Sequence, residues 1–89
     1  MTEPIQLDTH YDCTASHHIT QLNGPDHLAS LMPGTIILVN GWEYMRLAGC
    51  WPSWVHVDGK RLTHQEMWNL IVARKQDGRK VTLLHVGAA

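Results

Sequence analysis

The sequence predicts an α+β fold, in which one helix covers a small, mainly antiparallel sheet of about five or six short strands, curled or forming an open barrel. A strong hairpin turn, Asn40-Gly41, lies between two strand-like runs near the middle of the chain. A capping motif at Thr63 starts the helix, and further glycine-containing turns separate the other short strands. With 89 residues, 44% of them hydrophobic, residues 1–89 should form a single domain.

The central hairpin comprises residues 36–39 and 42–47. Asn-Gly is the favoured pair for a two-residue type I′ turn, because both turn positions need a positive φ. Such a turn sets Val39 opposite Trp42 and Ile36 opposite Met45. Trp42 should then be part of the core, so that Trp42→Ala would cost about 3–5 kcal/mol of stability. The expected core comprises one hairpin face, Ile37, Val39, Trp42 and Tyr44, packed against Met67, Leu70 and Ile71 of the helix.

The segment before the hairpin is less regular. Residues 1–15 are polar without a hydrophobic period, which indicates a partly ordered N-terminal arm, and residues 16–22 have the character of a strand. A short N-terminal helix is expected at residues 25–32. Pro25 suits a first helical turn, and Asp26 suits the positive end of the helix dipole.

After the hairpin, residues 48–53 should form a loop that exposes Trp51. Residues 54–57 and 60–62 predict a second hairpin around a two-residue Asp58-Gly59 turn, which would set Val55 and Leu62 on one face. The capped helix follows at residues 64–76, and residues 81–86 form a last strand.

The apolar arc of helix 64–76 is wide. Met67, Leu70 and Ile71 make an ordinary core stripe, and Trp68 and Val72 extend it on one flank. Two accounts stay open for this flank. Either the N-terminal segment with Leu28, Leu31 and Met32 folds over it, or it meets a second copy of the chain in a homodimer.

Charge is divided between the two halves of the chain. Residues 1–45 carry five carboxylates and no Lys or Arg, whereas residues 46–89 carry all seven Lys and Arg and three carboxylates. The halves can neutralise each other in the fold, or the basic half can face nucleic acid. The candidate cations for such an interface are Lys60, Arg61, Arg74, Lys75, Arg79 and Lys80, with Trp51 or Trp54 as a stacking surface.

Metal and catalytic signatures are weak. Cys13 with His10 and His17 gives one local cluster of possible ligands, but its spacing does not match a structural zinc pattern, and a polar arm is the simpler interpretation. Neither a nucleophile motif nor a glycine-rich phosphate loop is present in the sequence. We therefore expect no enzyme activity and no cofactor.

The chain begins without the basic and then apolar pattern of a signal peptide. Its apolar runs fall short of the roughly 20 residues that cross a bilayer. These features predict a cytoplasmic protein without membrane contact, in which Cys13 and Cys50 are reduced.

The pattern of turns and core positions over about residues 33–87 resembles small uncharacterised proteins of actinobacteria and their bacteriophages. The resemblance implies a compact, β-rich domain of phage origin, and it carries no assigned activity. The motifs that carry it are Pro33-Gly34-Thr35, Gly41-Trp42, Gly49-Cys50-Trp51, Gly59-Lys60-Arg61-Leu62-Thr63, Glu66-Met67 and Val81-Thr82-Leu83-Leu84-His85.

Together these features predict a non-catalytic accessory protein that binds a host or phage macromolecule. The leading expectation is a protein partner, either another macromolecule or a second copy of the chain. The alternative is a nucleic-acid-binding module that uses the basic C-terminal half. The residues expected to contact a protein partner are Trp51, Trp54, Trp68 and Val72.

Overall fold

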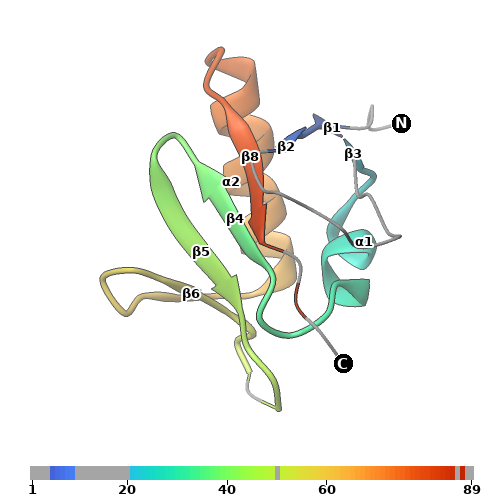
Figure 1. Ribbon diagram of the computed structural model, residues 1–89, viewed down its shortest axis with the longest axis vertical. Helices are drawn as coiled ribbons and strands as arrows, with labels where there is room; N and C mark the ends of the chain where they lie inside the picture. The colour runs from blue at the N-terminus through green and yellow to red at the C-terminus, as the bar shows by residue number, and fades with distance from the viewer. Residues whose placement is uncertain (1–4, 10–20, 50, 86, 88–89) are drawn as a thin grey trace.

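The computed structural model describes residues 5–9, 21–49, 51–85 and 87. Two helices and a series of short strands alternate along the chain (Figure 1). In order they are β1 (Ile5–Gln6), β2 (Asp8–Thr9), β3 (Gln21–Leu22), α1 (Pro25–Ser30), β4 (Ile36–Val39), β5 (Trp42–Arg46), β6 (Trp54–His56), β7 (Arg61–Leu62), α2 (His64–Gln76) and β8 (Val81–His85).

The main sheet has the strand order β2-β8-β4-β5-β6-β7. The five strands from β8 to β7 pair antiparallel, β2 joins β8 in parallel, and the sheet does not close on itself. β1 and β3 form a separate antiparallel pair. The predicted α+β class, with an open antiparallel sheet and a covering helix, is confirmed. The parallel β2 strand was not predicted, because its pairing joins distant segments of the chain.

The central hairpin has the predicted register, with Val39 opposite Trp42 and Ile36 opposite Met45. Asn40 and Gly41 have φ values of 53° and 83°, as a type I′ turn requires. The turn therefore fixes which side chains of β4 and β5 face α2, and this face carries the candidate site described below.

Helix α2 begins and ends as predicted. The Glu66 N–H donates to the Thr63 hydroxyl at 3.1 Å, and the Thr63 N–H donates to the Glu66 carboxylate at 2.9 Å, which completes the capping box. Helix α1 spans Pro25–Ser30 and is two residues shorter than the predicted range 25–32, because Leu31 adopts an extended conformation.

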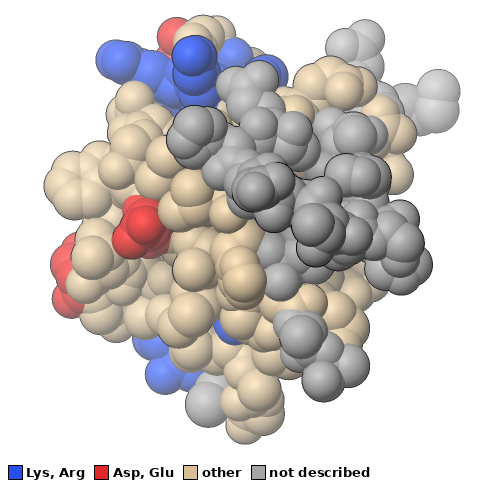
Figure 2. Space-filling model, viewed as in Figure 1, with Lys and Arg blue, Asp and Glu red and all other residues tan. Residues whose placement is uncertain are grey.

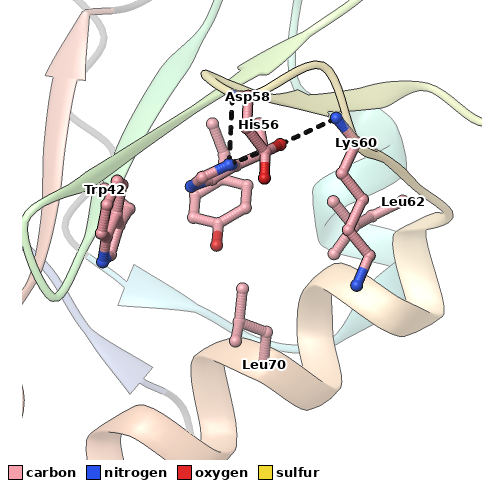
Figure 3. Close-up of a pocket in the computed structure, with 7 residues that line it drawn as sticks. Trp42, His56, Asp58, Lys60, Leu62 and Leu70 are labelled. Carbon is pink, nitrogen blue, oxygen red and sulfur yellow. Dashed lines mark hydrogen bonds and ion pairs between the residues drawn. The ribbon is translucent and has the colours of Figure 1, made fainter.

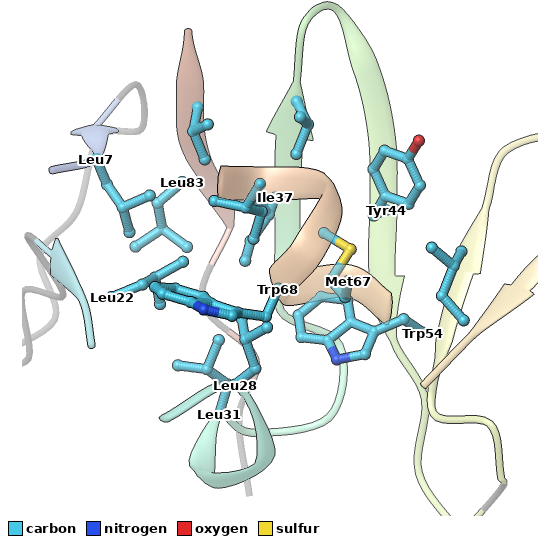
Figure 4. Close-up of a cluster of buried hydrophobic side chains, with 14 residues drawn as sticks. Leu7, Leu22, Leu28, Leu31, Ile37, Tyr44, Trp54, Met67, Trp68 and Leu83 are labelled. Atoms are coloured by element: carbon cyan, nitrogen blue, oxygen red, sulfur yellow. The ribbon is translucent and has the colours of Figure 1, made fainter. Parts of the chain in front are cut away.

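The core lies between the sheet and α2 and continues under α1 (Figure 4). The Trp68 indole lies among Leu22, Leu28 and Leu31 in that view, while Met67 lies toward Trp54. Helices α1 and α2 contact each other, and Trp68 is only 5% exposed. The N-terminal segment therefore covers the Trp68 flank, as one of the two sequence-based accounts expected, although Met32 is 37% exposed.

The expectation that Trp42 belongs to the core is wrong. Its side chain is 54% exposed, although it lies on the same sheet face as the buried Ile37 and Tyr44. It is the first residue of β5, and a hollow separates it from Leu70 and Arg74 of α2, which leaves the indole covered on one side only. The cost of about 3–5 kcal/mol that a buried Trp implies therefore does not apply.

The register of the second hairpin also differs from the prediction. Val55 lies opposite Arg61, not on the face of Leu62, and Trp54 lies opposite Leu62. The Gly59 N–H donates to the His56 carbonyl, and Gly59 has a φ of 95°, which indicates a turn closed by a left-handed glycine over residues 57–59. This longer loop directs Leu62 into the core.

Candidate functional site

The inner sheet face and α2 leave a groove at the hairpin end of the sheet. It consists of two hollows of about 320 and 230 Å³ that share Trp42, Tyr44 and Leu70 as lining residues. We call it the Trp42 groove. Its remaining lining residues are His56, Asp58, Lys60 and Leu62 in the first hollow, and Val39, Asn40 and Arg74 in the second.

The elements position these side chains by simple periodicities. Alternation along β5 places Trp42 and Tyr44 on the face toward α2, and pairing of β5 with β6 sets His56 opposite Tyr44. Leu70 and Arg74 are four residues apart in α2 and therefore share one helix face. Figure 3 shows Trp42 and Lys60 on opposite sides of the first hollow, with Leu70 of α2 below them.

His56 is the centre of an aromatic cluster. Its ring centroid lies 5.2 Å from that of Trp42 and 4.7 Å from that of Tyr44, and both ring pairs are tilted. Tilted pairs at such distances are favourable beyond the area that they bury. His56 therefore supports the exposed Trp42 indole from one side, which leaves another part of the indole open to a ligand.

Asp58 fixes the turn beside this cluster. Its Oδ1 accepts from the Lys60 N–H at 2.9 Å and lies 2.8 Å from His56 Nδ1, and the Asp58 N–H donates to the same His56 nitrogen at 3.2 Å. The hydrogen bond from the Lys60 backbone and the contact with His56 lower the pKa of Asp58. Both His56 and Asp58 thus hold the turn in place.

Tyr44 lies deeper in the groove. Burial and the nearby charge of Asp58 raise the pKa of its phenol, against a smaller opposite effect of Arg74. The phenol therefore stays protonated at neutral pH and can donate a hydrogen bond. The groove combines an open indole, a phenol donor and the cationic side chains of Lys60 and Arg74. Such a set can stack on a flat ligand and pair with negative charge.

The tryptophans that the sequence suggested as partner contacts have different surroundings. Trp51 is 67% exposed and rests edge-on against His64, with 5.5 Å between the ring centroids. Trp54 is fully buried and its indole N–H donates to His64 Nδ1 at 3.0 Å, so its proposed role as a contact or stacking residue is wrong. Burial and the charge of Arg46 lower the pKa of His64.

Trp68 and Val72 do not form an open apolar patch. Trp68 is buried, Val72 is half-buried, and three of the six residues that line the hollow of about 460 Å³ beside them are polar. The expectation that this flank is an exposed apolar contact surface is therefore wrong. The polar side chains are Gln65, Asn69 and Gln76.

The six candidate cations do not share one surface. Arg61 lies opposite Val55, and its guanidinium donates to the Pro52 carbonyl at 3.0 and 2.7 Å, which ties it to the loop of Trp51. Lys60 and Arg74 line the Trp42 groove. Figure 2 shows Lys and Arg gathered at the end of the molecule where α2 ends and β8 begins; the sequence there contains Arg74, Lys75, Arg79 and Lys80.

The outer face of the sheet is the second notable surface. Ile36, Met45 and Val55 are neighbours across β4, β5 and β6, and with Val57 they line a hollow of about 280 Å³. Met45 and Val57 are 39% and 65% exposed. This face is mostly apolar, with Glu43 as a carboxylate at its margin.

The suggested metal ligands Cys13, His10 and His17, and the cysteine Cys50, lie outside the described residues. Within the part of the chain that the structure describes, no group of three or more His, Cys, Asp or Glu side chains could hold a metal ion. In the same part, neither helix has the length and apolar character needed to cross a membrane.

The sequence did not predict the groove, although it indicated two of the lining residues. The predicted hairpin register already put Trp42 and Tyr44 on the face toward the helix. His56 was the missing residue, because its place opposite Tyr44 depends on pairing between β5 and β6, which the sequence does not specify. The hollow itself depends on how far α2 lies from the hairpin end.

Comparison with known proteins finds no matching family model, no matching curated protein and no matching solved structure.

Proposed function

We propose that this is a small, non-catalytic accessory protein that binds a host or phage macromolecule through the Trp42 groove. The sequence resemblance supports a phage origin, and with it a place of action in the cytoplasm of a bacterial host. The observation that carries the proposal is the Trp42 side chain, which is 54% exposed and supported by His56 at the edge of a hollow. Exposed aromatic side chains beside concave surfaces are typical contact residues.

The chemistry of the groove favours binding over catalysis. The acid–base pair that catalysis would most readily use, His56 and Asp58, is engaged with the backbone of its own turn. The remaining groups are an indole, a phenol, aliphatic side chains and two cations. These groups recognise a ligand by shape, stacking and charge.

The test is affinity capture from an extract of the natural host with three baits: the parent chain, Trp42→Ala and Trp51→Ala. Trp51 is a matched control, because it is also an exposed tryptophan and lies by His64 at the start of α2. We expect one protein or nucleic acid to be retained by the parent and by Trp51→Ala, and lost from Trp42→Ala. Retention of the same material by all three baits would contradict the groove as the contact surface.

A second candidate function is contact with a protein partner on the outer sheet face, and the partner we propose is a second copy of the chain. The observation that favours it is the apolar row of Ile36, Met45 and Val55 across three paired strands, with Val57 exposed beside it. A two-fold axis would pack this row against itself.

Light scattering on the parent and on Met45→Glu tests this second candidate. A dimer that Met45→Glu converts to a folded monomer supports it. A parent that remains monomeric at the highest accessible concentration contradicts it.

A further inference from the structure

Cationic side chains flank the Trp42 groove, and they indicate which class of macromolecule it binds. Trp42 lies between two cationic groups, with Lys60 in one hollow and Arg74 in the other. The turn after α2 lies next to the Asn40-Gly41 turn that precedes Trp42. The Asn40 N–H donates to the Lys80 carbonyl at 3.1 Å, and Val39 pairs with Val81. An exposed indole is therefore flanked by cations on both sides.

We propose that the Trp42 groove binds single-stranded nucleic acid, with one base stacked on the Trp42 indole and the neighbouring phosphates paired with the surrounding Lys and Arg side chains. This inference rests on the proposed function, because it names the ligand of the same groove. Proteins that bind single strands combine a cationic track with aromatic side chains on which bases stack. The cationic track here comprises Lys60 and Arg74, which line the groove, and the exposed Arg79 and Lys80 of the turn after α2, where the Lys80 carbonyl accepts from the Asn40 N–H.

The indole has the geometry that stacking needs. It is more than half exposed, yet His56 restrains it through a ring contact at 5.2 Å. A base that stacks there would meet the hollow of about 230 Å³ that Tyr44, Leu70 and Arg74 line with it. The protonated Tyr44 phenol gives this hollow a hydrogen-bond donor.

The nearby carboxylates do not prevent Lys60 and Arg74 from pairing with phosphate. Arg74 pairs with Asp77 at 3.2 Å, but their side chains are 42% and 57% exposed, and exposed pairs of this kind contribute little stability. Arg74 can therefore exchange Asp77 for a phosphate. Asp58 is already occupied by the Lys60 backbone and by His56. The groove therefore offers positive charge to a ligand through Lys60 and Arg74, although the whole chain has a net charge of −1.

A single strand is favoured over a duplex by the shape of this surface. The aromatic contact is one indole at the edge of a hollow, and it can stack only on a base whose face is open. In a duplex the base faces are stacked on each other, and only groove edges and phosphates are accessible. The groove should therefore prefer unpaired bases.

The experiment measures fluorescence anisotropy of a labelled oligothymidine of about 20 nucleotides, titrated with the intact chain at several salt concentrations. We expect the logarithm of the binding constant to fall linearly with the logarithm of the salt concentration, with a slope of about −0.7 for each phosphate contact. Trp42→Ala should weaken binding about 5- to 100-fold, the range known for loss of one stacked base. Trp51→Ala should stay within about twofold of the parent.

A charge variant tests the cationic track separately. The double variant Arg79→Gln/Lys80→Gln should lower the salt slope by about 1.4, because two phosphate contacts are lost. Circular dichroism checks that each variant is folded. A variant at Trp42 should fold, since most of that side chain is in solvent.

Three results would overturn the inference: no binding at low salt, equal loss of affinity in Trp42→Ala and Trp51→Ala, or a duplex of the same length bound at least as tightly as the single strand. If the host-extract experiment yields a protein that depends on Trp42 while oligothymidine does not bind, the proposed function stands and the nucleic-acid inference fails.

Discussion

Replacing the buried Trp54 by Phe should destabilise the protein by about 2–4 kcal/mol. Trp54 is fully buried between β6 and α2, and its indole N–H donates to His64 Nδ1 at 3.0 Å. Loss of the hydrogen bond contributes about 1 kcal/mol, and the smaller ring leaves a cavity that contributes the rest. Phe is preferred to Ala as the replacement because the larger deletion, at about 3–5 kcal/mol, could unfold a domain of this size.

The assay is urea unfolding followed by far-ultraviolet circular dichroism, because tryptophan fluorescence changes with each variant. Trp51→Ala is the control and should cost less than about 1 kcal/mol, since its side chain is 67% exposed. Trp42→Ala should cost less than about 1.5 kcal/mol, mainly from its ring contact with His56. A Trp54→Phe variant within about 0.5 kcal/mol of the parent, at an unchanged m-value, would refute the placement of Trp54 in the core.

Three further predictions concern the helix and the C-terminal segment. Burial lowers the pKa of His64, so its contribution to stability should be full above about pH 6.5 and decline as the pH falls through the lowered pKa. The difference between the urea midpoints at pH 7 and pH 5 should therefore be smaller in His64→Gln than in the parent chain, and an equal difference would contradict this. Thr63→Ala removes the hydroxyl of the capping box and should lower the free energy of unfolding by about 1 kcal/mol, which calorimetry would record as a fall in Tm of about 4–8 °C. An unchanged Tm would show that the cap does not stabilise α2. Gly87→Ala would place a Cβ against the carbonyl oxygen of Pro33, so thermal unfolding should show that the variant is about 1–3 kcal/mol less stable than the parent. A variant as stable as the parent would show that this contact is not tight.

The sequence predicted best the features that depend on neighbouring residues. Asn40-Gly41 specifies its own turn, and the turn then sets the register of β4 and β5. The capping box of Thr63 and Glu66 likewise starts α2 where it was expected. In both cases residues that are close in the sequence specify the structure, so distant contacts need not be known to predict it.

The features that were missed depend on distant contacts or on a finer local choice. The exposure of Trp42 is decided by how far α2 reaches along the sheet, and the choice between the two accounts of Trp68 is decided by α1 packing against α2. Residue spacing identifies an apolar face but does not show what covers it. The sequence does not specify the loop at Asp58-Gly59, because the same dipeptide suits either a two-residue turn or a longer one closed by a left-handed glycine.

The candidate site followed the same division. The positions of Lys60, Arg74 and the residues after α2 could be anticipated, because cations belong in the last turn of a helix and in exposed turns. The role of Trp42 could not, because the hairpin register alone puts its side chain on the core face of the sheet. Its exposure becomes evident only when the hollow between β5 and α2 is known.

The most direct test of the Trp42 groove is nuclear magnetic resonance of the indole N–H groups during titration with oligothymidine. The four tryptophans give four indole signals, which single substitutions assign. We predict that the Trp42 signal shifts or broadens, while the signals of Trp51, buried Trp54 and buried Trp68 stay in place. A shift confined to Trp51, or no shift of Trp42 at saturation, would contradict the groove as the binding surface.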